Sequence, residues 1–335
     1  MTTGDEVTLQ HARCVEGPRW PVAKQVLAGL VSLLPGGQRI LAARGTGGHA
    51  SAGYHYGVWL RQLRVLQEAG ASHAPLDVAE VGPGDMLGIG LAALLSGSRS
   101  YVAVDAVPHA RAMDHSDLLD EVHALLSRRE AADPGAEFPI DMLPSARLDA
   151  ALAPERIATL RNLLSRSRMT DELSCVAVSS DAATSPTLRY VAPWSSDSSL
   201  PSESVDLVCS QAAMEHVDDY EACYAAQARW LRPGGFALHH VDFDCHWTAR
   251  RWNGHWGHGD AAWRVLRGRR PYLINKAPCA WHLRAMRDHG LQPVLVRREY
   301  REDGIAREAL ALRYRDLEDE DLRTAAAMIV ARKPM

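Results

Sequence analysis

The chain has 335 residues, of which 47% are hydrophobic and 23% charged, and its formal net charge is −4. This composition suits one large folded domain and excludes a disordered chain or a protein whose whole surface binds nucleic acid. No apolar run approaches the roughly 18–20 residues of a membrane span. The six cysteines form no CxxC pair and the start of the chain has no secretion signal, so we expect a cytoplasmic protein without a membrane partner.

Two helices are predicted before the first strand. Residues 22–34 and 54–70 both show helical spacing of apolar residues, the first ended by "PGG" and the second by a glycine. We therefore expect residues 1–70 to form a helical lid segment over the main domain, residues 71–335.

Three consecutive aromatic or imidazole side chains open the second helix. They can face inward, toward a bound cofactor or acceptor, or they can pack as the first turn of an ordinary helix. The candidates are Tyr54, His55 and Tyr56.

A strand–loop–helix–strand unit spans residues 77–106. "DVAEV" reads as a short buried strand, a glycine-rich loop opens the helix "MLGIGLAALLSG", and the second strand, "SYVAVDA", ends in an acid. Such a unit is the building block of a parallel, doubly wound α/β sheet.

A long stretch interrupts the alternation of strands and helices between about residues 107 and 186. It has helical patches and proline breaks and is too long for an ordinary connection, so we expect a mainly helical insertion that caps the domain. The alternation then resumes, with strands predicted at 188–194, 204–210, 236–243, 291–300 and 325–333.

The glycine loop allows three interpretations. Its glycines can serve the turn alone. A dinucleotide site would need the spacing GxGxxG, whereas this loop has GxGxxxG, and Glu80 and Asp85 beside it would repel a pyrophosphate. Two carboxylates suit a ligand with an ammonium group and a ribose diol, which is the chemistry of S-adenosylmethionine.

Four motifs in order resemble those of class I S-adenosylmethionine-dependent methyltransferases, in particular the small-molecule branch called methyltransferase type 11. They are "VAEVGPGDMLGIG", "YVAVDA", "VDLVCSQAAMEHV" and "WLRPGGFALHHVDF", within roughly 77–110 and 188–245. The resemblance implies a Rossmann-like, doubly wound, seven-stranded α/β sheet. It also implies S-adenosyl-L-methionine as the cofactor and S-adenosyl-L-homocysteine as the product.

The resemblance implies a cofactor site at the ends of the first two strands. Gly82 and Gly84 would let the backbone approach the methionine end of the cofactor, with Glu80 beneath them and Asp85 in the same turn. Asp105 would accept hydrogen bonds from both ribose hydroxyls, although its residue type and place also fit a helix cap.

Two further cofactor contacts are implied. Gln211 stands where the chain passes the sulfonium in the resembled family. The adenine pocket departs from the family pattern, because Ser196 holds the place of the usual acid. The adenine contact is therefore assigned to Asp197 or Trp194.

Histidines and aspartates gather after the strand "FALHHVDF". If the chain stays extended, alternate residues share a face, which would align His240, Asp242, Asp244 and His246, and His255 follows on a loop. The preferred interpretation is a general base, His246 first, with Asp242 beside it and the others contacting the acceptor. Two alternatives stay open. One is a polar network that only anchors the loop, and the other is a divalent metal site. Because the spacing matches no standard metal site, we expect activity without a metal.

Two more candidates belong to the acceptor side. His216, in the "EH" pair after the fourth strand of the family pattern, is either catalytic or structural. Arg270 lies in the basic run "RVLRGRRPY", within an expected substrate loop at about 244–280. It either clamps an acidic group of the acceptor or is solvated surface.

The reaction expected is methyl transfer to an oxygen, nitrogen or carbon of a small molecule, such as a natural-product intermediate or a sugar. The sequence "CSQAAMEH" lacks the [DNS]-Pro-Pro-[YF] motif of amino-base methyltransferases and the Pro-Cys pair of cytosine-C5 enzymes. Two alternatives stay open: a protein or RNA acceptor, or a protein that binds the cofactor without transferring its methyl group. No nucleic-acid partner is expected. Whether the chain forms a homodimer stays open.

Overall fold

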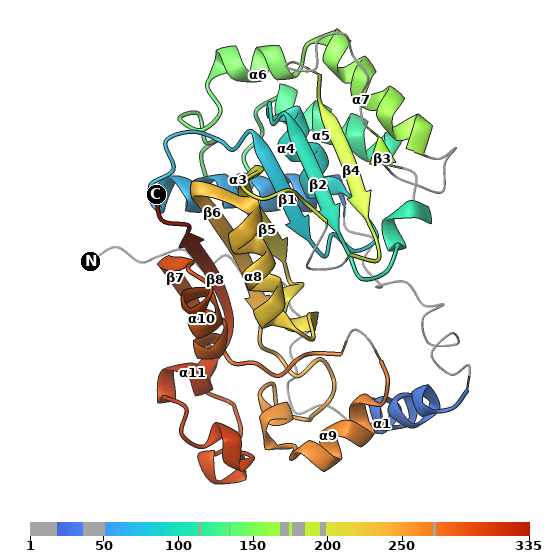
Figure 1. Cartoon of the computed structure of the whole chain (residues 1–335), viewed down its shortest axis with the longest axis vertical. Coiled ribbons are helices and arrows are strands. Elements are labelled where there is room, and N and C mark those ends of the chain that lie inside the picture. Colours follow the sequence, from blue (N-terminus) through green and yellow to red (C-terminus); the bar gives the residue numbers. More distant parts are fainter. Residues whose placement is uncertain are drawn as a thin grey trace.

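The computed structural model describes residues 19–35, 51–112, 115–133, 135–167, 174–175, 185–194, 199–270 and 273–335. Within them the chain forms one mixed sheet with helices on both faces (Figure 1). Its strands are β1 (Asp77–Val81), β2 (Ser100–Val104), β3 (Ser174–Cys175), β4 (Thr187–Val191), β5 (Val205–Gln211), β6 (Leu231–Asp242), β7 (Gln292–Tyr300) and β8 (Thr324–Arg332).

The strand order is β3-β4-β2-β1-β5-β6-β8-β7. Strands β4, β2, β1, β5 and β6 are parallel, whereas β8 runs antiparallel between β6 and β7. The chain thus starts in the middle of the sheet and winds outward in both directions, which confirms the predicted doubly wound fold. The two-residue β3, antiparallel to β4, adds an eighth strand to the seven expected.

The helices are α1 (Arg19–Leu33), α3 (Ala52–Glu68), α4 (Gly88–Leu95), α5 (Ser116–Ser127), α6 (Ser145–Ala151), α7 (Pro154–Ser167), α8 (Tyr220–Trp230), α9 (Asp260–Arg267), α10 (Cys279–Asp288) and α11 (Asp319–Arg323). None of the helices in the described ranges has the length and apolar character of a membrane span.

Two hydrophobic cores lie on opposite faces of the sheet. Helices α3, α4 and α5 pack with one face, to which β1 contributes Val78, and α8 and α10 pack with the other, to which it contributes Ala79. Every residue of β1 is buried, because helices cover both of its faces. This is why its apolar residues, Val78, Ala79 and Val81, do not simply alternate with polar ones.

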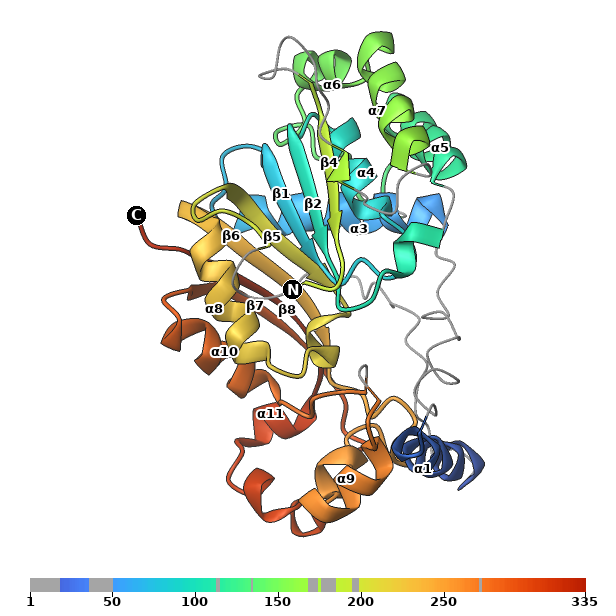
Figure 2. The ribbon, with the colours of Figure 1, turned by 45° about the vertical axis from the view of Figure 1, so that its right-hand side comes forward.

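The regular secondary structure in the described part of the 107–186 stretch is helical apart from β3, and turns and irregular chain connect the helices. Helix α5 packs against α3 and α4, and α6 and α7 lie beyond the amino ends of β1, β2 and β4 (Figures 1 and 2). Arg147 ties α6 to this edge by donating to the carbonyls of Ser96, Ala74 and Pro75, at 2.9, 3.2 and 3.2 Å. These helices therefore lie at the edge opposite the one where doubly wound sheets bind ligands.

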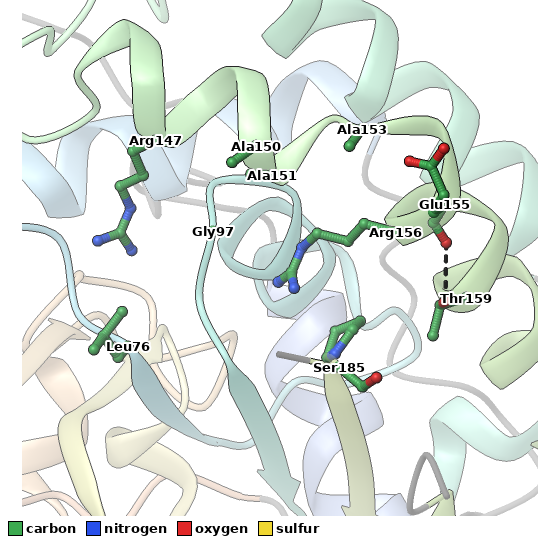
Figure 3. Close-up of a pocket in the computed structure, with 11 residues that line it drawn as sticks. Leu76, Gly97, Arg147, Ala150, Ala151, Ala153, Glu155, Arg156, Thr159 and Ser185 are labelled. Atoms are coloured by element: carbon green, nitrogen blue, oxygen red, sulfur yellow. Dashed lines mark hydrogen bonds between the residues drawn. The ribbon is translucent and has the colours of Figure 1, made fainter. Parts of the chain in front are cut away.

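A cavity of about 520 Å³ lies at the same amino edge, between α6, α7 and the starts of the strands (Figure 3). Arg147 and Arg156 reach into it, but their guanidinium groups donate to backbone carbonyls of the α4 end and the neighbouring loops. The cavity is thus built around groups that fasten the insertion to the sheet.

Two helices lie on the side of the carboxyl edge. Helix α9, in the segment that follows β6, packs against α1 beyond the strand ends (Figure 2). A Cβ built on Gly29 would lie 2.2 Å from the carbonyl oxygen of Leu266, so the two helices touch backbone to backbone.

Candidate active site

The glycine loop after β1 adopts a conformation that side chains disfavour. Gly82 and Gly84 have φ of +68° and +69°, in the left-handed region. The Gly82 amide donates to the carbonyl of Val104 at 2.9 Å, which ties the loop to β2. A Cβ on Gly82 would lie 2.7 Å from that of Ala213, in the turn after β5. The loop is therefore a bare backbone surface at the carboxyl edge.

Glu80 lies beneath this loop, in the core. It is 2% exposed and accepts a hydrogen bond from the Tyr101 hydroxyl at 2.5 Å. Burial raises the pKa of its carboxyl to about 7; the Tyr101 hydrogen bond opposes this rise and the Asp105 charge adds to it. Its place beneath the loop is the one that the sequence resemblance implies.

Asp105 follows β2 and is half-buried next to the glycine loop. Its Oδ1 accepts from the amides of Ala106 and Val107, at 2.7 and 3.4 Å. Burial raises the pKa of the carboxyl, while these amides, the charge of His109 and the Gly84 amide act in the opposite direction. Asp85, on the loop itself, lies 3.9 Å from the Nδ1 of His109.

The adenine candidates have different outcomes. The Trp194 amide donates to the Asp105 carbonyl at 3.0 Å, and its ring meets that of Trp230 edge-on at 5.8 Å. It therefore follows β4 directly beside Asp105. Asp197 lies outside the described residues.

Of the three candidate residues at the start of α3, only Tyr54 lies at the carboxyl edge of the sheet. Tyr54 is 40% exposed and hydrogen-bonds Gln211 at the end of β5. His55 is buried over α4, where a Cβ on Gly88 would lie 2.2 Å from its Cγ, and burial lowers its pKa to about 4. The Tyr56 hydroxyl donates to the carbonyl of Glu130, so it points away from this edge.

A group of four side chains, Glu215, His216, Asp242 and His246, lies where β5 and β6 end; we call it the His246 cluster. His246 Nε2 is 3.4 Å from Asp242 Oδ2, and its ring meets that of His216 edge-on at 4.9 Å. Glu215, His216 and His246 each offer a ligand atom within 4.8 Å of the others. Glu215 is not among the predicted site residues; the available signal was its place directly before His216 in the "EH" pair.

The charges of the cluster are strongly coupled. Burial lowers the pKa of His246, but the hydrogen bond and charge of Asp242, with Glu215, outweigh burial and raise it overall. Burial and the Asp242 charge raise the pKa of Glu215 to about 8, although His246 and the amides of Glu215 and Asp242 act in the opposite direction. The protonation of each of these groups therefore depends on the charge of its neighbours.

The expectation that the strand continues to His246 is wrong. Strand β6 ends at Asp242, and His246 and Trp247 have φ of +46° and +65°, so the chain turns and folds His246 back onto Asp242. The amide of Asp244 donates to Asp242 Oδ1 at 2.8 Å inside this turn. The turn, rather than strand alternation, brings the two residues together.

The side chains of the remaining candidates have their closest partners outside the cluster. His240 Nε2 lies 4.0 Å from Glu299 on β7, and Asp244 Oδ2 lies 3.5 Å from an Arg301 nitrogen. His255 is buried against Trp256, and burial, with the Lys276 charge, lowers its pKa far below the usual range. Arg270 donates to Gln25 and to the Leu266 carbonyl, so it joins α9 to α1.

Comparisons with known proteins point to the same class. Residues 170–239 match a family model described as a methyltransferase domain. A search of curated proteins finds no match. The strand order and the ordered motifs are those of class I S-adenosylmethionine-dependent methyltransferases, the match over residues 170–239 supports this class, and together they indicate S-adenosylmethionine as the cofactor.

Several solved structures are similar in outline. A methyltransferase from Methanosarcina mazei has 12% identity and a TM-score of 0.42 over 81% of this chain and 97% of its own. One from Mesorhizobium loti has 14% identity and a TM-score of 0.40, over 80% and 96%. The geranyl diphosphate C-methyltransferase of Streptomyces coelicolor has 14% identity and a TM-score of 0.41, over 82% and 78%. At such distances none of them bears on the acceptor.

The residues present fit the cofactor. The left-handed Gly82 and Gly84 give the loop two positions without side chains, and the half-buried carboxylate of Asp105 lies next to the Gly84 amide. An ammonium or a pair of hydroxyl groups can use such a carboxylate, as the sequence pattern predicts.

Proposed function

We propose that the chain transfers the methyl group of S-adenosylmethionine to a small molecule held between the glycine loop and the His246 cluster. One observation carries this proposal. The glycine loop meets the turn after β5 at Gly82 and Ala213, and Glu215 follows Ala213 by two residues. The cofactor side and the polar cluster therefore face one another across the carboxyl edge.

Each part has a defined role in this proposal. The backbone of the glycine loop and the Asp105 carboxylate hold the cofactor, which supplies an electrophilic methyl group on its sulfonium. Asp242 and His246 orient the acceptor atom and remove its proton. Holding two reactants in line is the main contribution of an enzyme to such a displacement, and proton removal adds to it.

The aromatic segment after β6 supports a small acceptor. The segment after β6 contributes buried aromatic rings, Trp252 and Trp256, and its two ring systems pack edge-on at 6.0 Å. Together with α1 and α9 it lies beyond the strand ends (Figure 2). A protein or RNA acceptor would require an open basic groove instead, and the net charge of −4 offers no general attraction for RNA.

We also place the protein in a reducing compartment, the cytoplasm. Four cysteines, Cys209, Cys223, Cys245 and Cys279, are buried and carry free thiols. Burial raises the pKa of the Cys223 thiol to about 12, which keeps it protonated and unreactive.

The test is methyl transfer from S-adenosylmethionine labelled in its methyl group. Purified chain is incubated with small-molecule, RNA and protein fractions of a cell extract, and the Asp105→Ala variant serves as the inactive control. We expect label in the small-molecule fraction, dependent on Asp105. Label found only in RNA or protein would refute the acceptor class, and cofactor binding without any transfer would favour a non-methylating protein.

A further inference from the structure

We propose that Glu215, His216 and His246 bind one divalent transition-metal cation, and that the acceptor chelates this cation through two neighbouring oxygen atoms. The second half of the proposal rests on the proposed function, because it assumes an acceptor at the carboxyl edge. The first half, the cation site, stands on geometry alone. It departs from the sequence-based expectation that no metal is needed.

The geometry is that of three converging ligands. Glu215 and His216 belong to the single turn of 3-10 helix after β5, and His246 comes from the turn after β6. Their ligand atoms lie within 4.8 Å of one another. A tetrahedral cation at about 2.0–2.2 Å from each atom would hold its ligands about 3.4 Å apart, so these side chains would have to close by at most about 1.4 Å around it.

The Glu215 carboxyl gives an independent indication of a missing ligand. It is 3% exposed, and neither of its oxygens has a hydrogen-bond partner of normal geometry. A buried carboxyl group without hydrogen bonds costs free energy, and more so when it is charged. A bound cation would satisfy the carboxylate directly.

Neighbouring side chains hold the proposed ligands in place. Asp242 lies 3.4 Å from the His246 imidazole, and a carboxylate is the usual neighbour of a metal-binding histidine. Asn275 fixes the turn that carries Glu215, because its side chain donates to the carbonyls of Met214 and Val217 at 2.8 and 2.9 Å. The ligands are thus held by contacts that need no metal.

The donor set indicates the type of cation. Two imidazoles and one carboxylate suit zinc, iron(II), cobalt or nickel better than magnesium or calcium, which prefer oxygen ligands. Three protein ligands leave positions free, as in catalytic rather than structural zinc sites. Those positions are where an acceptor with two adjacent oxygens, such as a hydroxyl beside a carbonyl or carboxylate, can bind.

The chemistry then balances without a further reagent. The acceptor hydroxyl, bound to the cation, loses its proton to solvent, because a Lewis acid lowers the pKa of a coordinated hydroxyl. The oxygen lone pair forms the new C–O bond as the C–S bond breaks, and the sulfonium becomes the neutral thioether of S-adenosylhomocysteine. In this scheme His246 is a ligand instead of the general base.

The experiment measures cation binding to the full chain without cofactor or acceptor. The chain is freed of metal by chelator and titrated with Zn²⁺ by calorimetry and with Co²⁺ by visible absorption. The variants Glu215→Gln and His216→Gln are compared with His289→Gln, a histidine at the end of α10 outside the cluster. Affinity for S-adenosylhomocysteine is measured on each protein in parallel.

We expect one ion per wild-type chain and at least about 100-fold weaker binding in both cluster variants, since even outer contacts of a metal site are worth 10–100-fold. The control should bind as wild type. Absence of stoichiometric binding, or equal binding by folded His216→Gln, would overturn the site. If Glu215→Gln does not fold, the half-buried His216 carries the test.

The outcomes separate this proposal from the function on which it rests. If wild-type chain binds S-adenosylhomocysteine and methylates a small molecule in the presence of chelator, the proposed function stands and the proposed metal site is refuted. If the chain binds the cation but not S-adenosylhomocysteine, the proposed cation site stands and the proposed function is refuted. An acceptor without paired oxygens would refute the chelation alone.

Discussion

Gly82 and Ala213 approach so closely that a Cβ on the glycine would lie 2.7 Å from the Cβ of the alanine. Gly82 also has a φ of +68°, so Gly82→Ala should cost about 1–2 kcal/mol for conformation alone, with the contact added. We expect a lower melting temperature and weaker cofactor binding. Gly70→Ala is the matched control, because Gly70 has a φ of +95° and open space around it. Equal losses in both variants would show that the contact is unimportant.

Replacement of Arg147 tests how the insertion is fastened. Arg147→Met removes three hydrogen bonds to the carbonyls of Ser96, Ala74 and Pro75 and leaves those carbonyls at a partly buried edge. We expect the free energy of unfolding to fall by about 1–3 kcal/mol in urea denaturation. Arg128→Met, on an exposed side chain paired with Glu130, should change little.

Cofactor affinity should not change in Arg147→Met, because Arg147 lies at the amino edge of the sheet and the glycine loop at the other. A variant that keeps its stability but loses affinity would contradict this placement.

The buried histidines make stability depend on pH. Burial lowers the pKa of both His239 and His282 to about 3, with the His282 charge adding to the shift at His239. Between about pH 3 and 6.5 the unfolded chain binds protons at these sites and the folded chain does not. Stability is therefore full above pH 6.5 and falls on acidification, by up to about 1.4 kcal/mol per pH unit for each histidine.

The slope of unfolding free energy against pH isolates this effect. His282→Phe should flatten the slope between pH 5 and 6.5, whatever its effect on absolute stability, because one titrating group is gone. His123→Gln, which removes a less buried histidine of α5, is measured in parallel as the control. An unchanged slope in His282→Phe would rule out this assignment.

Loss of His246 should affect turnover and not cofactor binding. As base or as ligand, His246 acts on the acceptor, so His246→Ala should lower the rate by ~10²–10⁴-fold with affinity for S-adenosylhomocysteine unchanged. Arg250→Gln, an exposed position in the same loop, is the control. A stable His246→Ala protein with full activity would remove the cluster from the mechanism.

The positions of the proposed cofactor-binding residues could be predicted from the sequence, because each residue type has a physical meaning in its local context. Glycines after a strand, and an acid at the end of the next strand, each have a physical meaning within a few residues. Gly82, Gly84 and Asp105 accordingly meet at one edge. The doubly wound sheet follows from the same alternation of strands and helices.

The His246 cluster depends on the positions at which the chain turns. The alternation of residues along a strand does not reveal these positions. The left-handed conformation of His246 folds it back onto Asp242, while His240 points toward Glu299 instead. Glu215 joins the group only through the turn after β5. Likewise, nothing in the spacing of its basic run indicated that Arg270 joins two helices.

The most direct test of the account is calorimetry with S-adenosylhomocysteine on wild-type chain and on Asp105→Ala. We expect one molecule bound per wild-type chain and a loss of about 1.5–3 kcal/mol in the variant, the usual value of a hydrogen bond to a charged group. Asp288→Ala, at the exposed end of α10, should bind as wild type. No binding by wild-type chain, or equal affinity in Asp105→Ala, would contradict the cofactor site proposed for this fold.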